Sequence, residues 1–189
     1  MKNNELILNY LAGDISAFNV LVRKNQDELY NFLVKYTGDR EVARDIMQQT
    51  FILVYKKLKK LQEIEKFKSW LYTIAVNQCK NYFRKKREIN FSEISSKQDF
   101  DFDPGDEHKF SANNHSSNVI IKKALQAIPK EQRVVVIMKQ YHNLKFTEIA
   151  SILNEPVNTV KARLYYGLTA LKNVITNWGI EKEDLGYEM

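Results

Sequence analysis

The stretch FTEIASILNEPVNTVKARL, from Phe146 to Leu164, determines the fold predicted for the second half of the chain. Ala150 is small enough for a following helix to pack closely against it. Four residues later, Asn154 tolerates the positive φ of a tight turn, and Val160 places a branched apolar side chain in the next helix. Three more apolar residues complete the expected core: Ile149, Leu153 and Leu164. The spacing predicts a helix-turn-helix with helices over 146–153 and 156 to about 175.

The second of these helices carries polar side chains that point outward or sideways from the expected core. They are Asn158, Thr159, Lys161, Arg163 and Tyr166. Cationic groups hold phosphates, and amide and hydroxyl groups bond to base edges in a major groove. A plain pair of antiparallel helices could show the same apolar spacing, but the basic outward residues favour DNA binding.

Two further helices are expected just upstream. One covers 119–128, and the next begins at Pro129, which suits the first position of a helix. The run Val134–Ile137 would also suit a buried strand, and that alternative stays open. We predict a helix because the apolar residues continue at helical spacing through Met138 and Tyr141.

The first half of the chain also repeats its apolar residues at helical spacing. A helix runs from a cap at Asp14 or Ser16 to Gly38, and another begins at Asp39, whose side chain can accept from first-turn amides. A short helix over 4–11 and a long one from Phe67 to about Arg87 complete a helical bundle. The inner face expected for the helix after Asp39 is formed by Val42, Ile46, Thr50, Leu53 and Val54.

The long helix that closes this bundle ends in a basic segment. Its cations can hold phosphates and the amides between them can read base edges, although a solvated helix end would show the same composition. The candidate nucleic-acid contacts here are Asn77, Lys80, Asn81, Arg84 and Arg87.

Charge divides the chain into segments. Residues 1–87 carry 17 Lys and Arg against 9 Asp and Glu, whereas residues 88–117 carry 2 against 7. Residues 118–175 are basic again, with 9 against 3. Two basic modules that meet a polyanion, joined by an acidic linker rich in turn formers, explain this pattern. We therefore expect an all-α protein of two small helical domains, without a fixed relative orientation. The expected boundaries are 1–90, a flexible linker over 91–117, 118–176 and a short acidic tail over 177–189.

Composition argues against several classes of protein. The longest apolar run, Val134–Met138, is too short to span a membrane, so we expect a soluble cytoplasmic protein without membrane insertion. One cysteine and three scattered histidines offer no zinc ligand set, and no glycine-rich phosphate loop is present. We expect no metal, no cofactor and no enzymatic activity.

These residues resemble a known family. The segments ARDIMQQTF (43–51) and FKSWLYTIAVN (67–77) resemble region 2 of the bacterial RNA polymerase sigma factors of the extracytoplasmic-function (ECF) group, within the sigma-70 family. Further on, IPKEQR (128–133), FTEIA (146–150) and TVKARL (159–164) resemble region 4. The order, the spacing and the intervening linker also match, over about residues 3–175.

The resemblance implies partners for each surface. It implies that the helix bearing Asp45, Gln48, Gln49 and Phe51 docks on the β′ clamp helices of core RNA polymerase, and that the β flap is a further contact. It also implies that the first module holds the minus-10 promoter element, that the second reads the minus-35 element, and that an anti-sigma factor binds both modules. Asn81 replaces the usual aspartate, and Pro156 and Asn158 replace the frequent serine or glycine.

From these observations we expect the chain to bind core polymerase, direct it to promoters and help to open the promoter DNA. The principal alternative is a helix-turn-helix transcription regulator of the response-regulator type, with a sensing or dimerising first half. That half lacks the pattern of a doubly wound receiver domain and has its own basic, aromatic end, which counts against the alternative. A helical adaptor that binds only proteins would not explain two basic modules.

Overall fold

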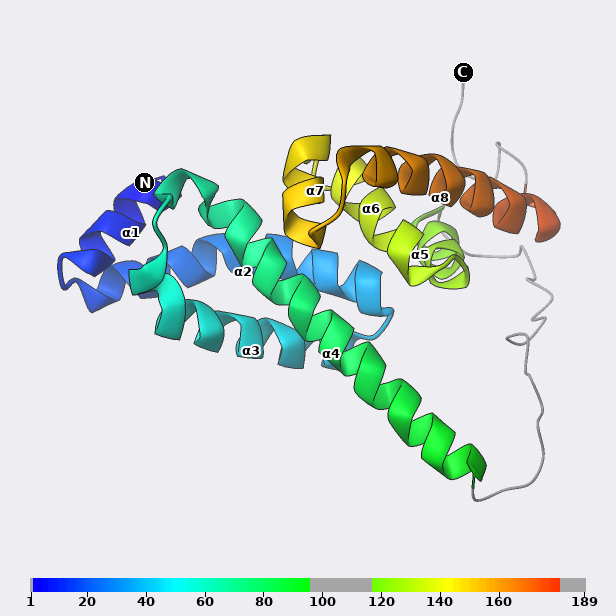
Figure 1. The fold of residues 1–189 in the computed structure, drawn as a ribbon, viewed down its shortest axis with the longest axis horizontal. Coiled ribbons are helices and arrows are strands. Elements are labelled where there is room, and N and C mark those ends of the chain that lie inside the picture. The colour runs from blue at the N-terminus through cyan, green and yellow to red at the C-terminus, as the bar shows by residue number, and fades with distance from the viewer. Residues whose placement is uncertain (1, 96–116, 181–189) are drawn as a thin grey trace.

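The computed structural model describes residues 2–95 and 117–180, and in these ranges all regular structure is helical. The first module contains α1 (Asn3–Leu11), α2 (Ile15–Thr37), α3 (Arg40–Lys57), two single 3₁₀ turns, η1 (Leu58–Lys60) and η2 (Ile64–Lys66), and α4 (Phe67–Ser95). The second contains α5 (Ser117–Ala127), α6 (Lys130–Gln140), α7 (Phe146–Leu153) and α8 (Val157–Asn177) (Figure 1). The prediction of an all-α protein of two helical domains is confirmed.

Local capping chemistry sets the ends of the first helices. The Asp14 carboxylate accepts from the Ser16 amide at 2.9 Å, and α2 ends at Gly38, whose φ of 81° suits glycine. The Asp39 carboxylate then accepts from the amides of Glu41 and Val42 at 2.8 and 3.1 Å. These interactions fix the sharp turn between α2 and α3 at the position that the sequence predicts.

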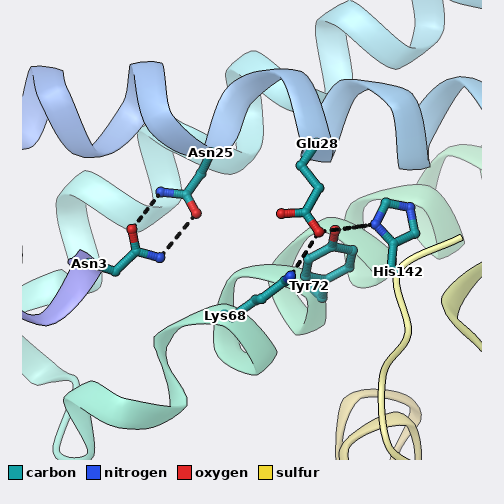
Figure 2. Close-up of polar contacts among 6 residues, drawn as sticks. All are labelled: Asn3, Asn25, Glu28, Lys68, Tyr72 and His142. Carbon is teal, nitrogen blue, oxygen red and sulfur yellow. Dashed lines mark hydrogen bonds and ion pairs between the residues drawn. The ribbon is translucent and has the colours of Figure 1, made fainter. Parts of the chain in front are cut away.

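Packing in the first module joins α2, α3 and α4 around a common apolar core, and α1 covers the start of α2. Asn25 is a polar residue within this core. Its amide exchanges two 3.2 Å hydrogen bonds with the Asn3 amide, and its nitrogen also donates to the Leu21 carbonyl (Figure 2). Asn25 therefore ties α1 to α2 without leaving its own amide groups unpaired.

Helix α6 forms the centre of the second module. Its residues Val134–Met138 are all buried, because α8, α7 and the first module surround the helix. A helix that is covered on all sides needs no polar stripe, which explains why this run also resembled a strand. The strand alternative for Val134–Ile137 is therefore wrong.

The two modules pack directly against each other. Helix α2 contacts α5 and α6, and α4 contacts α7. The Gln126 amide donates to the Lys35 carbonyl at 2.7 Å, and the Arg133 guanidinium donates to the Tyr36 carbonyl at 3.1 Å. The sequence predicts no fixed relative orientation of the modules, whereas in this arrangement side chains of α5 and α6 donate to carbonyls at the C-terminal end of α2.

The boundaries of the linker differ from the expectation. Helix α4 continues to Ser95, beyond the end expected near Arg87, so residues 91–95 are helical (Figure 1). Helix α8 ends at Asn177. The remaining parts of the predicted linker and tail, 96–116 and 181–189, lie outside the described residues.

Candidate functional site

The predicted helix-turn-helix is formed by α7 and α8. Asn154 ends α7 with φ 55° and ψ 51°, the left-handed conformation that the turn requires. At the start of α7, the Glu148 carboxylate accepts from the Lys145 amide at 2.7 Å. Val160 is fully buried between the two helices. Pro156 lies at the N-cap of α8 rather than inside the helix, so the helix begins one residue later than predicted.

The candidate minus-35 residues of α8 do not all lie on one face. Asn158, Lys161 and Tyr166 are exposed, whereas Thr159 and Arg163 are half-buried. The Arg163 guanidinium donates to the Glu155 carboxylate at 3.0 Å, and this ion pair turns it toward the first module. Arg163 is therefore less available to DNA in this arrangement than the sequence suggests.

Two exposed residues of α8 were missed by the sequence analysis. Ala162 and Tyr165 are exposed on the same face as Asn158 and Lys161, and the Tyr165 ring meets that of Tyr166 edge-on at 5.6 Å. Ala162 follows Asn158 by four residues and Tyr165 follows Lys161 by four, and this helical spacing is the signal that could have identified them. An exposed alanine on a reading helix can contact a thymine methyl group.

The candidate minus-10 residues all lie on α4 and are all exposed: Asn77, Lys80, Asn81, Arg84 and Arg87. They recur every three or four residues, so they form a continuous stripe along the helix. Arg84 has an ion pair with Glu88 at 3.9 Å, and the groups of that pair are about two-thirds exposed. A solvated pair of this kind leaves the guanidinium free to bind phosphate.

A cleft of about 380 Å³ lies between the two modules and brings together cations from both. Five cationic and two acidic residues line it, so positive charge predominates. The cations are Lys80, Arg84 and Arg87 from α4, Lys130 from α6 and Arg163 from α8. In this arrangement, residues predicted to bind the minus-10 and minus-35 elements face the same cleft.

The candidate polymerase residues all lie on α3, and all but one are exposed. Asp45, Gln48 and Gln49 are exposed, but only 9% of Phe51 is accessible because its ring packs in the core of the first module. The prediction that Phe51 faces a partner therefore conflicts with its position. Ile52 and Tyr55, which the sequence analysis did not select, are 53% and 47% exposed on this helix.

A second cleft, of about 310 Å³, separates α3 from α4. Asp45 and Gln49 line one wall, and Asn81 and Arg84 line the other. The candidate polymerase and minus-10 surfaces are therefore adjacent, which would allow a protein partner and a DNA strand to be bound side by side.

Other kinds of site find no support in the described ranges. In 2–95 and 117–180 no group of three His, Cys, Asp or Glu residues could hold a metal ion. Cys79 is fully buried, and this burial raises the pKa of its thiol to about 12. None of the helices described here is long and apolar enough to cross a membrane.

The structure thus defines a two-module helical protein with a helix-turn-helix in one module and an exposed basic helix in the other. Residues 21–89 match the family described as Sigma-70 region 2, and residues 118–171 match Sigma-70, region 4. Over 182 residues, the chain is 28% identical to the ECF RNA polymerase sigma-E factor of Escherichia coli strain K12, covering 93% of this chain and 95% of that protein. It is 25% identical over 183 residues to the RNA polymerase sigma-H factor of Pseudomonas aeruginosa, with coverages of 92% and 94%.

Solved structures share the fold. The sigma factor RpoE from Bartonella quintana, crystallised with the anti-sigma factor NepR, matches with a TM-score of 0.68 at 21% identity, over 86% of this chain and 98% of that one. CnrH, in complex with the cytosolic domain of CnrY, matches with a TM-score of 0.66 at 16% identity, over 93% and 97%.

The chain belongs to the sigma-70 family and is an RNA polymerase sigma factor of the ECF group. It directs RNA polymerase to promoters and binds DNA. The alternative of a response-regulator type is not favoured, because residues 21–89 match sigma region 2 rather than a receiver or sensing module.

Proposed function

We propose that this sigma factor docks on core RNA polymerase through the exposed face of α3. Asp45, Gln48 and Gln49 provide charge and amide groups, and Ile52 and Tyr55 provide exposed apolar surface on the same helix. Such a mixture of polar and apolar groups suits a protein interface. We assign the β′ clamp helices as the partner of this face and the β flap as a partner of the second module.

Promoter recognition is divided between α4 and α8 in this proposal. The basic stripe of α4 holds the minus-10 element through Asn77, Lys80, Asn81, Arg84 and Arg87. The reading helix α8 recognises the minus-35 element through Asn158, Thr159, Lys161, Arg163 and Tyr166. Residues 1–90 and 118–176 act as the two functional units. To reach a base, the Arg163 guanidinium must either break its ion pair with Glu155 or move together with the Glu155 side chain.

The proposed mode of action is binding rather than catalysis. Neutralisation of phosphates by the basic residues, together with stacking on unpaired bases, supplies the driving free energy. The factor requires no cofactor and works in the cytoplasm, where core polymerase and promoter DNA are found.

We assign an anti-sigma factor as a further partner. RpoE of Bartonella quintana, a sigma factor of the same fold, was solved with the anti-sigma factor NepR, and CnrH, which also has this fold, was solved with the cytosolic domain of CnrY. A partner that covers α3 near Gln48 and α8 near Arg163 at once would block both activities. Binding two tethered sites would also raise its apparent affinity.

The match of residues 21–89 to sigma region 2 carries the polymerase part of the proposal. It is tested by core binding of the full chain with Asp45→Ala and Gln48→Ala combined. We expect a loss of about tenfold or more in affinity. Asp27→Ala, exposed on α2, is the matched control and should bind normally. Normal core binding by the double variant would contradict the assignment of α3.

The DNA part is tested with the polymerase complex on a library of promoter fragments. If Lys161 contacts a phosphate, Lys161→Ala should weaken DNA binding. It should also reduce the slope of the logarithm of the binding constant against the logarithm of the salt concentration by about one. Lys172→Ala, exposed further along α8, is the control. Equal behaviour of the two variants would argue against the assigned reading face.

A further inference from the structure

His142 lies at the boundary between the modules, in the segment between α6 and α7. Its ring inserts between α2 and α4 of the first module, and only 5% of the side chain is exposed. The ring meets Phe32 and Tyr72 edge-on, with centroids 5.6 and 5.5 Å apart. Nδ1 lies 2.9 Å from the Tyr72 hydroxyl oxygen (Figure 2). A single residue of the second module therefore fills an aromatic site in the first.

Charged groups surround one side of this ring. Glu28 Oε1 of α2 lies 3.3 Å from His142 Nδ1 and 2.8 Å from Lys68 Nζ of α4. Burial opposes ionisation of Glu28, but its contacts with Lys68 and His142 outweigh this effect and lower the pKa of the carboxyl. Lys35 of α2 is a further cation near the ring. Glu28 is thus an anion that already has one cationic partner.

The site suits a neutral imidazole better than an imidazolium. A charged histidine has two N–H donors. His142 Nδ1 has two oxygen neighbours, but Nε2 is buried without a hydrogen-bond partner among the described residues. If His142 were protonated in the packed arrangement, part of the added charge would be buried away from water and the Nε2–H donor would have no acceptor. Burial lowers the pKa of His142, Lys68 and Lys35 lower it further, and Glu28 only partly compensates.

We propose that His142 is a proton-sensitive latch between the two modules. Neutral His142 holds its aromatic site and keeps the modules packed, whereas protonation favours the separated arrangement, in which water can solvate both ring nitrogens. The inference concerns the packing of the modules and holds whether or not α3 binds polymerase.

The sign of the pH effect follows from linkage. The packed arrangement binds fewer protons at His142 than the separated one, because its pKa lies below the ordinary value of 6.5. Above pH 6.5, His142 stabilises the packed arrangement fully. This stabilisation is lost as the pH falls from 6.5 to the lowered pKa of His142 in the packed arrangement. Each unit of lowering changes the ratio of packed to separated molecules by about tenfold.

Release of this latch would alter access to the basic cleft. In the packed arrangement, cations of α4 and α8 face each other there. Separation would expose both surfaces to solvent and to a larger partner. Mild acidification would thus increase the fraction of chains with accessible DNA-binding surfaces.

The experiment measures energy transfer between dyes on the two modules of the full chain. Asn19→Cys on α2 and Asn173→Cys on α8 provide exposed attachment sites. The native Cys79 does not compete, because it is buried and burial raises the pKa of its thiol to about 12. As the pH falls from about 7.5 to about 5.5, transfer should decrease while circular dichroism shows that the helices persist.

The His142→Gln variant removes the titrating group and should abolish this pH response. Tyr72→Phe keeps the ring contact and the histidine, so it should retain a pH-dependent change. A wild-type chain without a pH response, or the same response in His142→Gln, would overturn the proposal. If His142→Gln fails to pack at any pH, NMR titration of wild-type His142 decides: a midpoint at or above the ordinary 6.5 refutes the latch.

Discussion

Replacement of Arg133 by methionine tests whether one buried guanidinium organises the second module. Only 5% of Arg133 is exposed. Its guanidinium donates to the carbonyls of Gln126 and Ile128 at 2.6 and 3.0 Å, and to the Gln126 side-chain oxygen. Those carbonyls lie at the end of α5, where the helix itself offers no donors. Arg133 also reaches the Tyr36 carbonyl of the first module.

The expected loss follows from these bonds. A hydrogen bond from a charged donor contributes about 1.5–3 kcal/mol, and loss of the donor leaves buried carbonyls unpaired. The contributions are not additive, and methionine removes the cost of burying a charge while retaining much of the apolar packing. We therefore expect Arg133→Met to lower the free energy of unfolding by about 2–4 kcal/mol.

Urea unfolding followed by circular dichroism measures this change. The midpoint should fall by about 1–2 M at an unchanged slope. Arg23→Met, at an exposed position of α2, is the matched control and should shift stability by less than about 0.5 kcal/mol. If the two variants unfold at the same urea concentration, Arg133 does not stabilise the module in the way described.

Two further substitutions test close packing and turn geometry. A methyl group at Gly167 of α8 would lie 2.8 Å from Val136 Cγ2. Gly167→Ala should therefore lower the free energy of unfolding, measured by thermal unfolding, by about 1–2 kcal/mol, although alanine has the better helix propensity. A stabilised variant would show that α6 and α8 are more loosely packed. Asn154 adopts the left-handed conformation at the end of α7, so Asn154→Ala should cost about 1 kcal/mol by the same measurement, whereas Asn154→Gly should be nearly neutral. Equal stability of the alanine and glycine variants would contradict the assigned turn.

Local chemistry made most of the fold predictable. Asp14, Gly38 and Asp39 are residues with strong positional preferences at helix ends, and the structure uses each of them there. Ala150 and Asn154 likewise specify the helix-turn-helix, because few other residues allow the close packing and the positive φ. Interactions within about ten residues of sequence determine these features.

The packing of the two modules could not be predicted in the same way. In the sequence, Arg133 is an ordinary polar residue of a helix and His142 one at a helix end. In the structure, Arg133 contacts Tyr36 and His142 contacts Glu28, and each of these partners lies about a hundred residues away in sequence. Periodicity shows which side of a helix is buried but not what covers it.

Phe51 is more buried than its selection as a polymerase-binding residue implies. It follows Thr50 within the broad buried face of α3, but its place in a family segment favoured a surface role. The exposed face instead includes Ile52 and Tyr55, two large apolar residues that periodicity alone places outside the core.

If the modules separate as proposed, the cationic cleft between them would make their packing depend on ionic strength. Lys80, Arg84 and Arg87 on one wall repel Lys130 and Arg163 on the other. Salt would screen that repulsion and so would favour the packed arrangement. Salt also weakens the attraction of the same cations for phosphate. If the modules separate as proposed, a rise in ionic strength would therefore weaken DNA binding in two ways, by screening the phosphates and by favouring the arrangement in which the cations of the two modules face each other.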